Sequence, residues 1–132
     1  MKQYGLSQKE RIKSKKSFDD LFTSGKILIS KDQKIKAIFL LDKKAEEVGV
    51  KVAAVVSKKN GKAVWRNRVK RLIRTSFRLN KERLTNFCKE KSILLRIVFS
   101  AFSITEETTN RVRLKDIMPG VMELMQQIER KI

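Results

Sequence analysis

The sequence predicts a two-layer α+β or α/β sandwich, in which about three helices pack on a central sheet of about four strands. Three features predict it. Apolar residues occupy every second position of residues 48–56, as in a strand. Residues 64–79 then follow a helical period, and residues 93–99 form a continuous apolar, β-rich run typical of a central strand. A strand, a helix and a strand in this order predict a β-α-β unit with its helix on the sheet.

The chain before this unit predicts a basic arm and a short helix. Residues 1–16 are polar and hold six basic residues against one acid, Glu10. We therefore expect a flexible, extended arm. A short helix should follow and end near Gly25, because three apolar residues lie at helical spacing: Phe18, Leu21 and Phe22.

Two further strands and a C-terminal helix complete the expected order α-β-β-(β)-α-β-α, in one domain that spans the whole chain. Residues 34–41 alternate as in a strand, and the β-rich residues 27–30 leave room for a further short one. Apolar residues recur at helical spacing within residues 116–132. Asp116 can cap this helix, so that Pro119 falls in its first turn, where a missing N–H does little harm.

The predicted helix at 64–79 has an apolar side and a basic side. With about 100° per residue, Val69 and Leu72 stay within about 80° of Trp65, while most of the basic side chains lie opposite. Residues 58–83 hold eleven lysines and arginines against one acid, Glu82. Like charges at helical spacing repel one another, so this side favours a polyanion, such as RNA, whose phosphates it would neutralise.

The overall charge narrows the functional classes. The chain has 132 residues, a formal net charge of +18 and 41% hydrophobic residues, which is typical of a folded basic protein. Such a charge attracts nucleic acid, an anionic membrane or an acidic protein. The absence of histidine excludes histidine-based catalysis, and the single cysteine, Cys88, excludes an intramolecular disulfide. No run of eighteen apolar residues occurs, so we expect a soluble, cytoplasmic protein.

Acidic residues occur in adjacent pairs, but they do not predict a catalytic metal site. Neighbours on a helix point about 100° apart, and no histidine is present to join them. The pairs are Asp19-Asp20, Glu46-Glu47 and Glu106-Glu107.

Residues 57–74, SKKNGKAVWRNRVKRLIR, resemble nearly residue for residue the signature of the bacterial ribonuclease P protein subunits. The centre of the match is Arg66-Asn67-Arg68, followed by Lys70, Arg71 and Arg74. Residues 11–26, RIKSKKSFDDLFTSGK, are similar to the N-terminal segment of that family, in which a basic arm leads to two phenylalanines four residues apart and then a glycine. The resemblance covers essentially the whole chain.

The resemblance implies a fold and a function. The fold is akin to domains in a small-subunit ribosomal protein and in elongation factor G, and its β-α-β crossover is left-handed. The family assists an endonuclease that removes the 5′ leader of precursor tRNA by phosphodiester hydrolysis, leaving a 5′ phosphate. The catalyst is a large RNA that holds Mg²⁺. The resemblance therefore assigns no catalytic residue, metal or cofactor to this chain, and no small-molecule or membrane partner.

It also assigns two RNA contacts. The residues expected to bind the catalytic RNA are basic, apart from one amide: Lys58, Lys59, Lys62, Arg66, Asn67, Arg68, Lys70, Arg71, Arg74 and Arg78. The residues expected to line a cleft for the leader are Lys13, Phe18, Phe22 and Phe39. In this family the strand that faces the cleft often offers a tyrosine. This chain has only Ile38 and Phe39 there, and Phe39 is the aromatic one.

From the residues alone, each site also has a simpler interpretation. The basic helix side could be an ordinary solvated surface. Phe18 and Phe22 at this spacing favour core packing, and Trp65 is more simply a core residue than a stacking platform. Asn67 could stabilise a turn rather than contact RNA. The arm either solubilises the chain or steers phosphates with its lysines, Lys13, Lys15 and Lys16.

The start of the basic helix suggests one more contact. No Ser, Thr, Asp or Asn directly caps the helix near Ala63 and Val64, so its first N–H groups are expected to stay open to an anion. Three other functions remain open: a ribosomal or nucleoid scaffold, a stand-alone protein nuclease, and a protein that binds anionic membranes.

Overall fold

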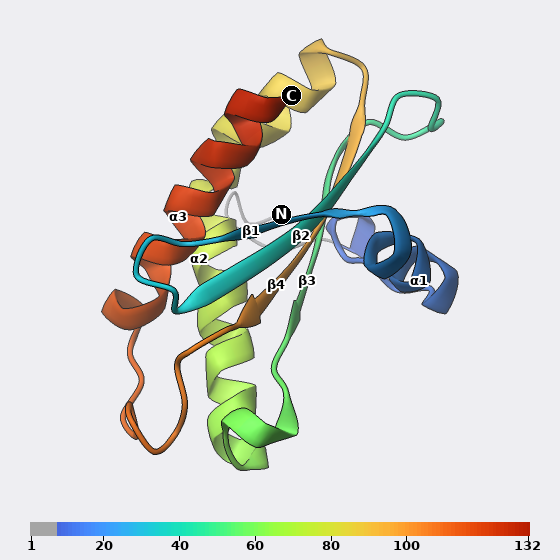
Figure 1. Cartoon of the computed structure of the whole chain (residues 1–132). Helices are drawn as coiled ribbons and strands as arrows, with labels where there is room; N and C mark the ends of the chain where they lie inside the picture. Colours follow the sequence, from blue (N-terminus) through green and yellow to red (C-terminus); the bar gives the residue numbers. More distant parts are fainter. Residues whose placement is uncertain (1–7) are drawn as a thin grey trace.

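The computed structural model describes residues 8–132, and its helices and strands follow the predicted order (Figure 1). The first seven residues of the predicted arm lie outside the described residues. The short strand expected near residues 27–30 is present. The elements are η1 (Gln8–Glu10), α1 (Lys15–Ser24), β1 (Lys26–Ile29), β2 (Ile35–Asp42), β3 (Gly49–Val55), η2 (Lys58–Asn60), α2 (Ala63–Glu90), β4 (Leu94–Ala101) and α3 (Leu114–Lys131).

The four strands form one mixed sheet in the order β1-β2-β4-β3. β3 and β4 are parallel neighbours joined through α2, which confirms the β-α-β unit, and the other pairs are antiparallel. α2 and α3 lie together on one face of the sheet, whereas α1 lies on the other face (Figure 1).

The main core lies between the sheet and the helices α2 and α3. Ile35, Ala37 and Phe39 of β2 point into it, because alternate residues of a strand face the same side. Ile38 points the opposite way and packs in a smaller cluster with Leu21 of α1. The sheet therefore separates the two predicted RNA contacts, because α2 and α1 lie on opposite faces.

α2 is longer than predicted, since it ends at Glu90 rather than near residue 79. Polar Asn80 and Lys81 interrupt the apolar pattern on which the prediction rested. Further along, Leu84 and Cys88 are buried in the same core as Phe77, so tertiary packing continues the helix.

α3 begins earlier than predicted, at Leu114. Asp116 is therefore the third helical residue rather than the cap, and its carboxylate accepts the Arg113 N–H at 2.8 Å. Pro119 consequently lies in the second turn, and the prediction of a first-turn proline is wrong. The proline has no N–H to donate to the carbonyl of Lys115, so one helical hydrogen bond is missing there.

The indole of Trp65 packs closely against Gly61 just before the start of α2. The side-chain amide of Asn60 donates to the Ile104 carbonyl at 2.8 Å and so ties this turn to the connection between β4 and α3. A Cβ on Gly61 would lie 2.6 Å from the ring of Trp65. Only a residue without a side chain lets the indole pack here.

We predict that Gly61→Ala lowers the free energy of unfolding by about 1–3 kcal/mol, because the new methyl group must displace the buried indole. Urea unfolding followed by the fluorescence of the single tryptophan measures this change. Lys62→Ala, at the neighbouring exposed position, is the control and should change stability by less than about 0.5 kcal/mol. Equal stabilities for Gly61→Ala and the wild type would contradict the packing described for Trp65.

Candidate nucleic-acid interface

The first turns of α2 are held by apolar burial and by two hydrogen bonds to the connection between β4 and α3. Trp65 is 4% exposed, and its indole N–H donates to the Thr109 carbonyl at 2.9 Å. The Nε of Arg68 donates to the Val112 carbonyl at 2.7 Å. The interpretation of Trp65 as a core residue is confirmed. Arg68 is anchored by one nitrogen, while its side chain stays exposed.

The side of α2 that faces away from the core carries a basic strip. We define it as Asn67, Lys70, Arg71, Arg74 and Arg78, flanked by Arg66 and Arg68. Within residues 8–132, none of its basic side chains forms an ion pair with a carboxylate. The side chains of Lys58, Lys59 and Lys62, just before the helix, are exposed and likewise form no ion pair with a carboxylate in the described part of the chain. The positive charges of the strip thus repel one another, and no described carboxylate offsets this repulsion.

Three arginines, Arg66, Arg74 and Arg78, are partly withdrawn from water. Burial lowers the pKa of Arg74, and the positive charges of Arg11 and Arg71 lower it further. The Nε of Arg66 is buried and has no hydrogen-bond partner among the described residues. Buried donors in proteins are usually bonded, and the Nε of Arg66 is an exception among the described residues.

Arg11 is a member of this surface that the sequence reasoning missed. It belongs to the N-terminal arm, and its backbone pairs with Val52 at the edge of β3. The pairing brings its charge close enough to lower the pKa of Arg74. The count of basic residues in the arm was the only signal in the sequence, and it did not show which of them reaches α2.

No side chain caps the start of α2, as the sequence predicts. The N–H of Lys62 donates to the Glu106 carboxylate at 2.8 Å, so a carboxylate of the chain itself lies at this helix terminus. Lys62 precedes the helix, so this contact does not use the first helical N–H groups, those of Ala63 and Val64. That these groups bind an external anion stays a prediction. Sequence reasoning missed Glu106 because it is more than forty residues away along the chain.

The leader-cleft candidates divide between the two faces of the sheet. On α1, the rings of Phe18 and Phe22 stack with centroids 6.4 Å apart and planes inclined by 20°. Phe18 is half-buried against the cluster of Leu21 and Ile38, whereas Phe22 is 57% exposed. The interpretation as core residues is therefore partly right for Phe18 and wrong for Phe22.

Phe39 does not belong to this surface. It is 2% exposed and lies in the main core, on the α2 side of the sheet. Its assignment to the leader cleft is contradicted, because the two-residue period of β2 points Ile38, and not Phe39, towards α1. Ile38 is itself only 7% exposed.

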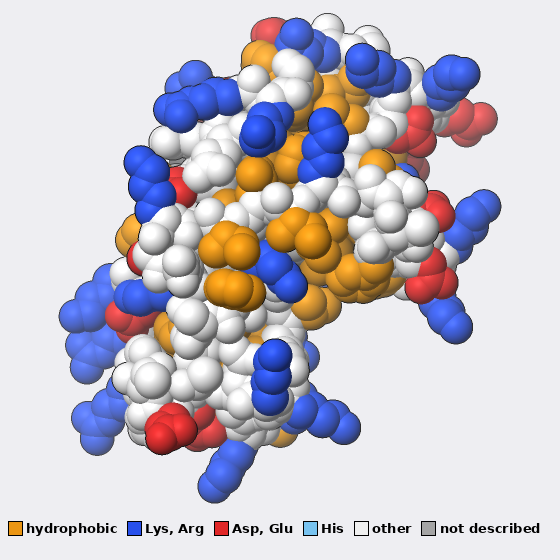
Figure 2. All heavy atoms as spheres, viewed as in Figure 1, with side chains coloured by type: hydrophobic (Ala, Val, Ile, Leu, Met, Phe, Trp, Pro, Cys, Tyr) orange, Lys and Arg blue, Asp and Glu red, His pale blue; other side chains and the backbone are white. Residues whose placement is uncertain are grey.

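The exposed lysines of the arm lie beside a shallow basic depression. Lys13, Lys15 and Lys16 are exposed at the start of α1. The depression is lined by residues of the arm, α1, β3 and the loop before β3, namely Lys9, Arg11, Ile12, Lys13, Ser14, Ser17, Glu47 and Lys51. Figure 2 shows lysine and arginine side chains spread over one view of the molecule, with hydrophobic side chains exposed near its centre.

The acidic pairs contribute to local contacts. Asp20 lies 3.9 Å from Arg96, and Glu47 lies 2.9 Å from Lys51, whose hydrogen bond and charge lower the pKa of Glu47. Among the residues that the structure describes, no three His, Cys, Asp or Glu side chains are grouped to hold a metal ion. Within the same residues, no helix has both the length and the apolar character that crossing a bilayer requires.

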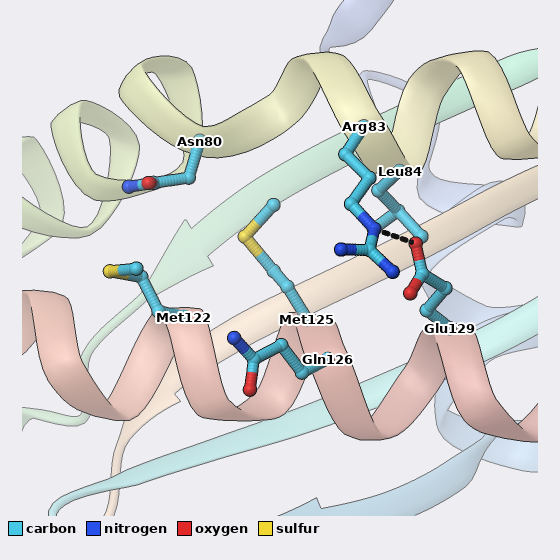
Figure 3. Close-up of a pocket in the computed structure, with 7 residues that line it drawn as sticks. All are labelled: Asn80, Arg83, Leu84, Met122, Met125, Gln126 and Glu129. Carbon is cyan, nitrogen blue, oxygen red and sulfur yellow. Dashed lines mark hydrogen bonds and ion pairs between the residues drawn. The ribbon is translucent and has the colours of Figure 1, made fainter.

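A second pocket lies between α2 and α3 and contains no candidate residue (Figure 3). Met122 and Met125 of α3 and Leu84 of α2 give it apolar walls. At one end, the Nε of Arg83 donates to the Glu129 carboxylate at 3.0 Å. Arg83 is thus neutralised within the chain, in contrast to the arginines of the basic strip.

A helix that is packed on a mixed sheet and carries a basic strip without carboxylate partners among the described residues defines a nucleic-acid-binding protein of the α+β class. The Ribonuclease P family model matches residues 6–118. The chain therefore belongs to the ribonuclease P family.

Individual relatives agree with this assignment. The chain is 32% identical over 101 residues to the ribonuclease P protein component of Porphyromonas gingivalis, covering 76% of this chain and 72% of the relative. It is 36% identical over 87 residues to that of Desulfosudis oleivorans, covering 65% and 67%. Its fold is similar to that of the RNase P protein from Thermotoga maritima, with a TM-score of 0.69 and 24% identity over 89% of this chain and 96% of that one. The RNase P protein of Staphylococcus aureus gives a TM-score of 0.66 and 23% identity, over 90% and 94%.

We predict that Glu106→Gln lowers the free energy of unfolding by about 0.3–1 kcal/mol, because it removes a negative charge from the N-terminus of α2. The neighbouring Glu107→Gln makes the same change in net charge at an exposed position and should leave stability unchanged. Thermal unfolding of both variants at low salt measures the difference. If both lose the same stability, Glu106 does not act through the helix terminus.

Proposed function

We propose that this chain acts as the protein subunit of ribonuclease P and binds the RNA subunit through the basic strip of α2. The observation that supports it best is the absence of carboxylate partners for these side chains within the described residues. Phosphates would replace the missing partners, and the release of their counterions would drive association. Arginines suit this task because the guanidinium fork can hold a phosphate through two hydrogen bonds.

The α1 side is proposed to guide the 5′ leader of precursor tRNA. Phe22 offers an exposed aromatic face beside Phe18, and aromatic faces stack on unpaired bases of any sequence. Lys13 and its lysine neighbours would meet the phosphates of the same strand. Because the sheet separates α1 from α2, one small protein can hold the RNA subunit and the substrate on different faces.

Cleavage is assigned to the RNA subunit and the Mg²⁺ ions that it holds. The chain has no histidine to act as a general base at neutral pH. Its contribution would be electrostatic: the charge of +18 lowers the repulsion between two RNAs and so lowers the Mg²⁺ concentration that they need. We place this step of tRNA 5′-end maturation in the cytoplasm.

Reconstitution with the RNA subunit tests the proposal. The RNA alone should cleave a precursor tRNA poorly at low Mg²⁺, and addition of this protein should restore cleavage that leaves a 5′ phosphate. A ribosomal or nucleoid scaffold would bind RNA without restoring cleavage. A stand-alone nuclease would cleave the precursor without the RNA subunit. Either result would overturn the proposal.

We predict that replacing Arg66, Arg68 and Arg71 together by Gln weakens binding to the RNA subunit and flattens its salt dependence. The slope of log affinity against log salt should fall by about 2–3, because each lost phosphate contact removes about 0.7–0.9. The control replaces three exposed arginines outside the strip, Arg83, Arg111 and Arg130, and makes the same change in net charge. Equal slopes for both triple variants would show general charge attraction rather than contacts at the strip.

We predict that Phe22→Ala weakens binding of precursor tRNA to the holoenzyme by about 1–3 kcal/mol, because one aromatic platform for a leader base is lost. Binding of mature tRNA, which has no leader, should not change. Phe102→Ala, which removes another exposed phenylalanine outside α1, is the control. Equilibrium titration measures both affinities. If Phe22→Ala weakens the binding of precursor tRNA and mature tRNA equally, the leader contact is contradicted.

A further inference from the structure

The N-terminal arm is built into the fold between Glu10 and Ser14. Arg11 forms a parallel bridge with Val52 at the edge of β3, and the N–H of Ile12 donates to the Val52 carbonyl at 3.1 Å. Ile12 is 7% exposed and packs in the cluster beneath α1. The arm therefore crosses the edge of the sheet from the α2 side to the α1 side.

An ion pair joins this arm to α2. Both carboxylate oxygens of Glu10 lie 2.8 Å from the Nζ of Lys81. The Lys81 side chain is 13% exposed and that of Glu10 19%, whereas the surface pair of Lys51 and Glu47 is 27% and 60% exposed. A pair that is mostly withdrawn from water is costly to break on one side, because the remaining charge stays poorly solvated.

Lys81 continues the line of the basic strip. It lies seven residues after Arg74 and three after Arg78, so the three side chains share one side of α2. Lys81 has a carboxylate partner, while no described carboxylate pairs with Arg74 or Arg78. The contact of Glu10 thus fastens the arm at the end of the strip and leaves the strip itself unneutralised.

Arg11 follows Glu10 directly, and its bridge with Val52 holds it at the edge of β3, next to the residue that contacts Lys81 of α2. Arg11 is exposed, and its charge, together with that of Arg71, lowers the pKa of the partly buried Arg74. Gathering three guanidinium groups is unfavourable in the free protein, because like charges repel. A polyanion would turn the same arrangement into a favourable one.

We infer that the Glu10–Lys81 ion pair is a positioning contact, which holds the arm so that Arg11, Arg71 and Arg74 form one phosphate-binding site where the arm, β3 and α2 meet. The ligand is the phosphodiester backbone of the RNA subunit. This inference rests on the proposed function, since it adds Arg11 and its support to the RNA-binding surface.

The Glu10→Gln variant distinguishes this role from simple charge attraction. It makes the protein more positive by one unit, so general attraction alone would strengthen RNA binding. If the pair positions Arg11, the variant instead binds more weakly, by roughly fivefold, and its salt slope falls by about 0.7–0.9, the value of one phosphate contact. The two explanations predict opposite signs.

A double-mutant cycle with the transcribed RNA subunit as the probe completes the test. Arg11→Gln should also weaken binding, and once Arg11 is replaced, Glu10→Gln should weaken it no further, because both remove the same contact. The charge-swapped variant Glu10→Lys with Lys81→Glu keeps the net charge and an ion pair, and it should restore affinity. Amide hydrogen exchange at Ile12, measured on the free full-length protein, should be faster in Glu10→Gln and return to the wild-type rate in the swap.

The control is Glu129→Gln, which removes the partner of Arg83 and adds the same positive charge without touching the arm. It should bind RNA as well as the wild type or better. The inference fails if Glu10→Gln matches this control, or if Arg11→Gln leaves the slope unchanged while the triple arginine variant of the strip lowers it. Absence of binding even by the wild type would instead refute the proposed function.

Discussion

The burial of one side of α2 is the constraint on which the rest of the structure depends. Trp65, Val69 and Ile73 are almost completely buried against the sheet, so the charged side of the same helix must face outward. Burying side chains of this size contributes about 1.5–3 kcal/mol each, which exceeds the cost of a typical pair of neighbouring like charges on a helix surface. The apolar stripe can therefore hold together a set of cations that would otherwise disfavour a helix.

The sheet gives this arrangement its two-sided character. Alternation along β2 sends Phe39 into the core beneath α2 and Ile38 towards α1. The arm joins the two faces, because it pairs with the edge of β3 between Lys81 of α2 and the start of α1. Basic residues thus lie on the arm at the edge of the sheet as well as on α2.

Local patterns predicted most of the elements, because each rests on a period within a short segment. The β-α-β unit, the stripe of Trp65 and the additional strand near residues 27–30 could all be predicted in this way.

The patterns failed where distant parts of the chain decide the structure. α2 continues past residue 79 because Leu84 and Cys88 are buried in the main core. Glu106, which contacts the start of α2, belongs to a separate loop. The aromatic ring of Phe39 suggests a base-stacking role, but the two-residue period of β2 turns this ring into the core. Arg11 could not be singled out, since its proximity to Arg74 depends on an edge pairing that leaves no pattern in the sequence.

The most direct test of the central claim is chemical footprinting of the basic side chains, read by mass spectrometry with and without the RNA subunit. The account predicts that RNA protects Lys70, Arg71 and Arg74 from modification, while Arg83 and Arg130, outside the strip, react equally in both states. The opposite pattern, in which the strip stays reactive in the complex and other residues are protected, would contradict the claim that this side of α2 binds the RNA.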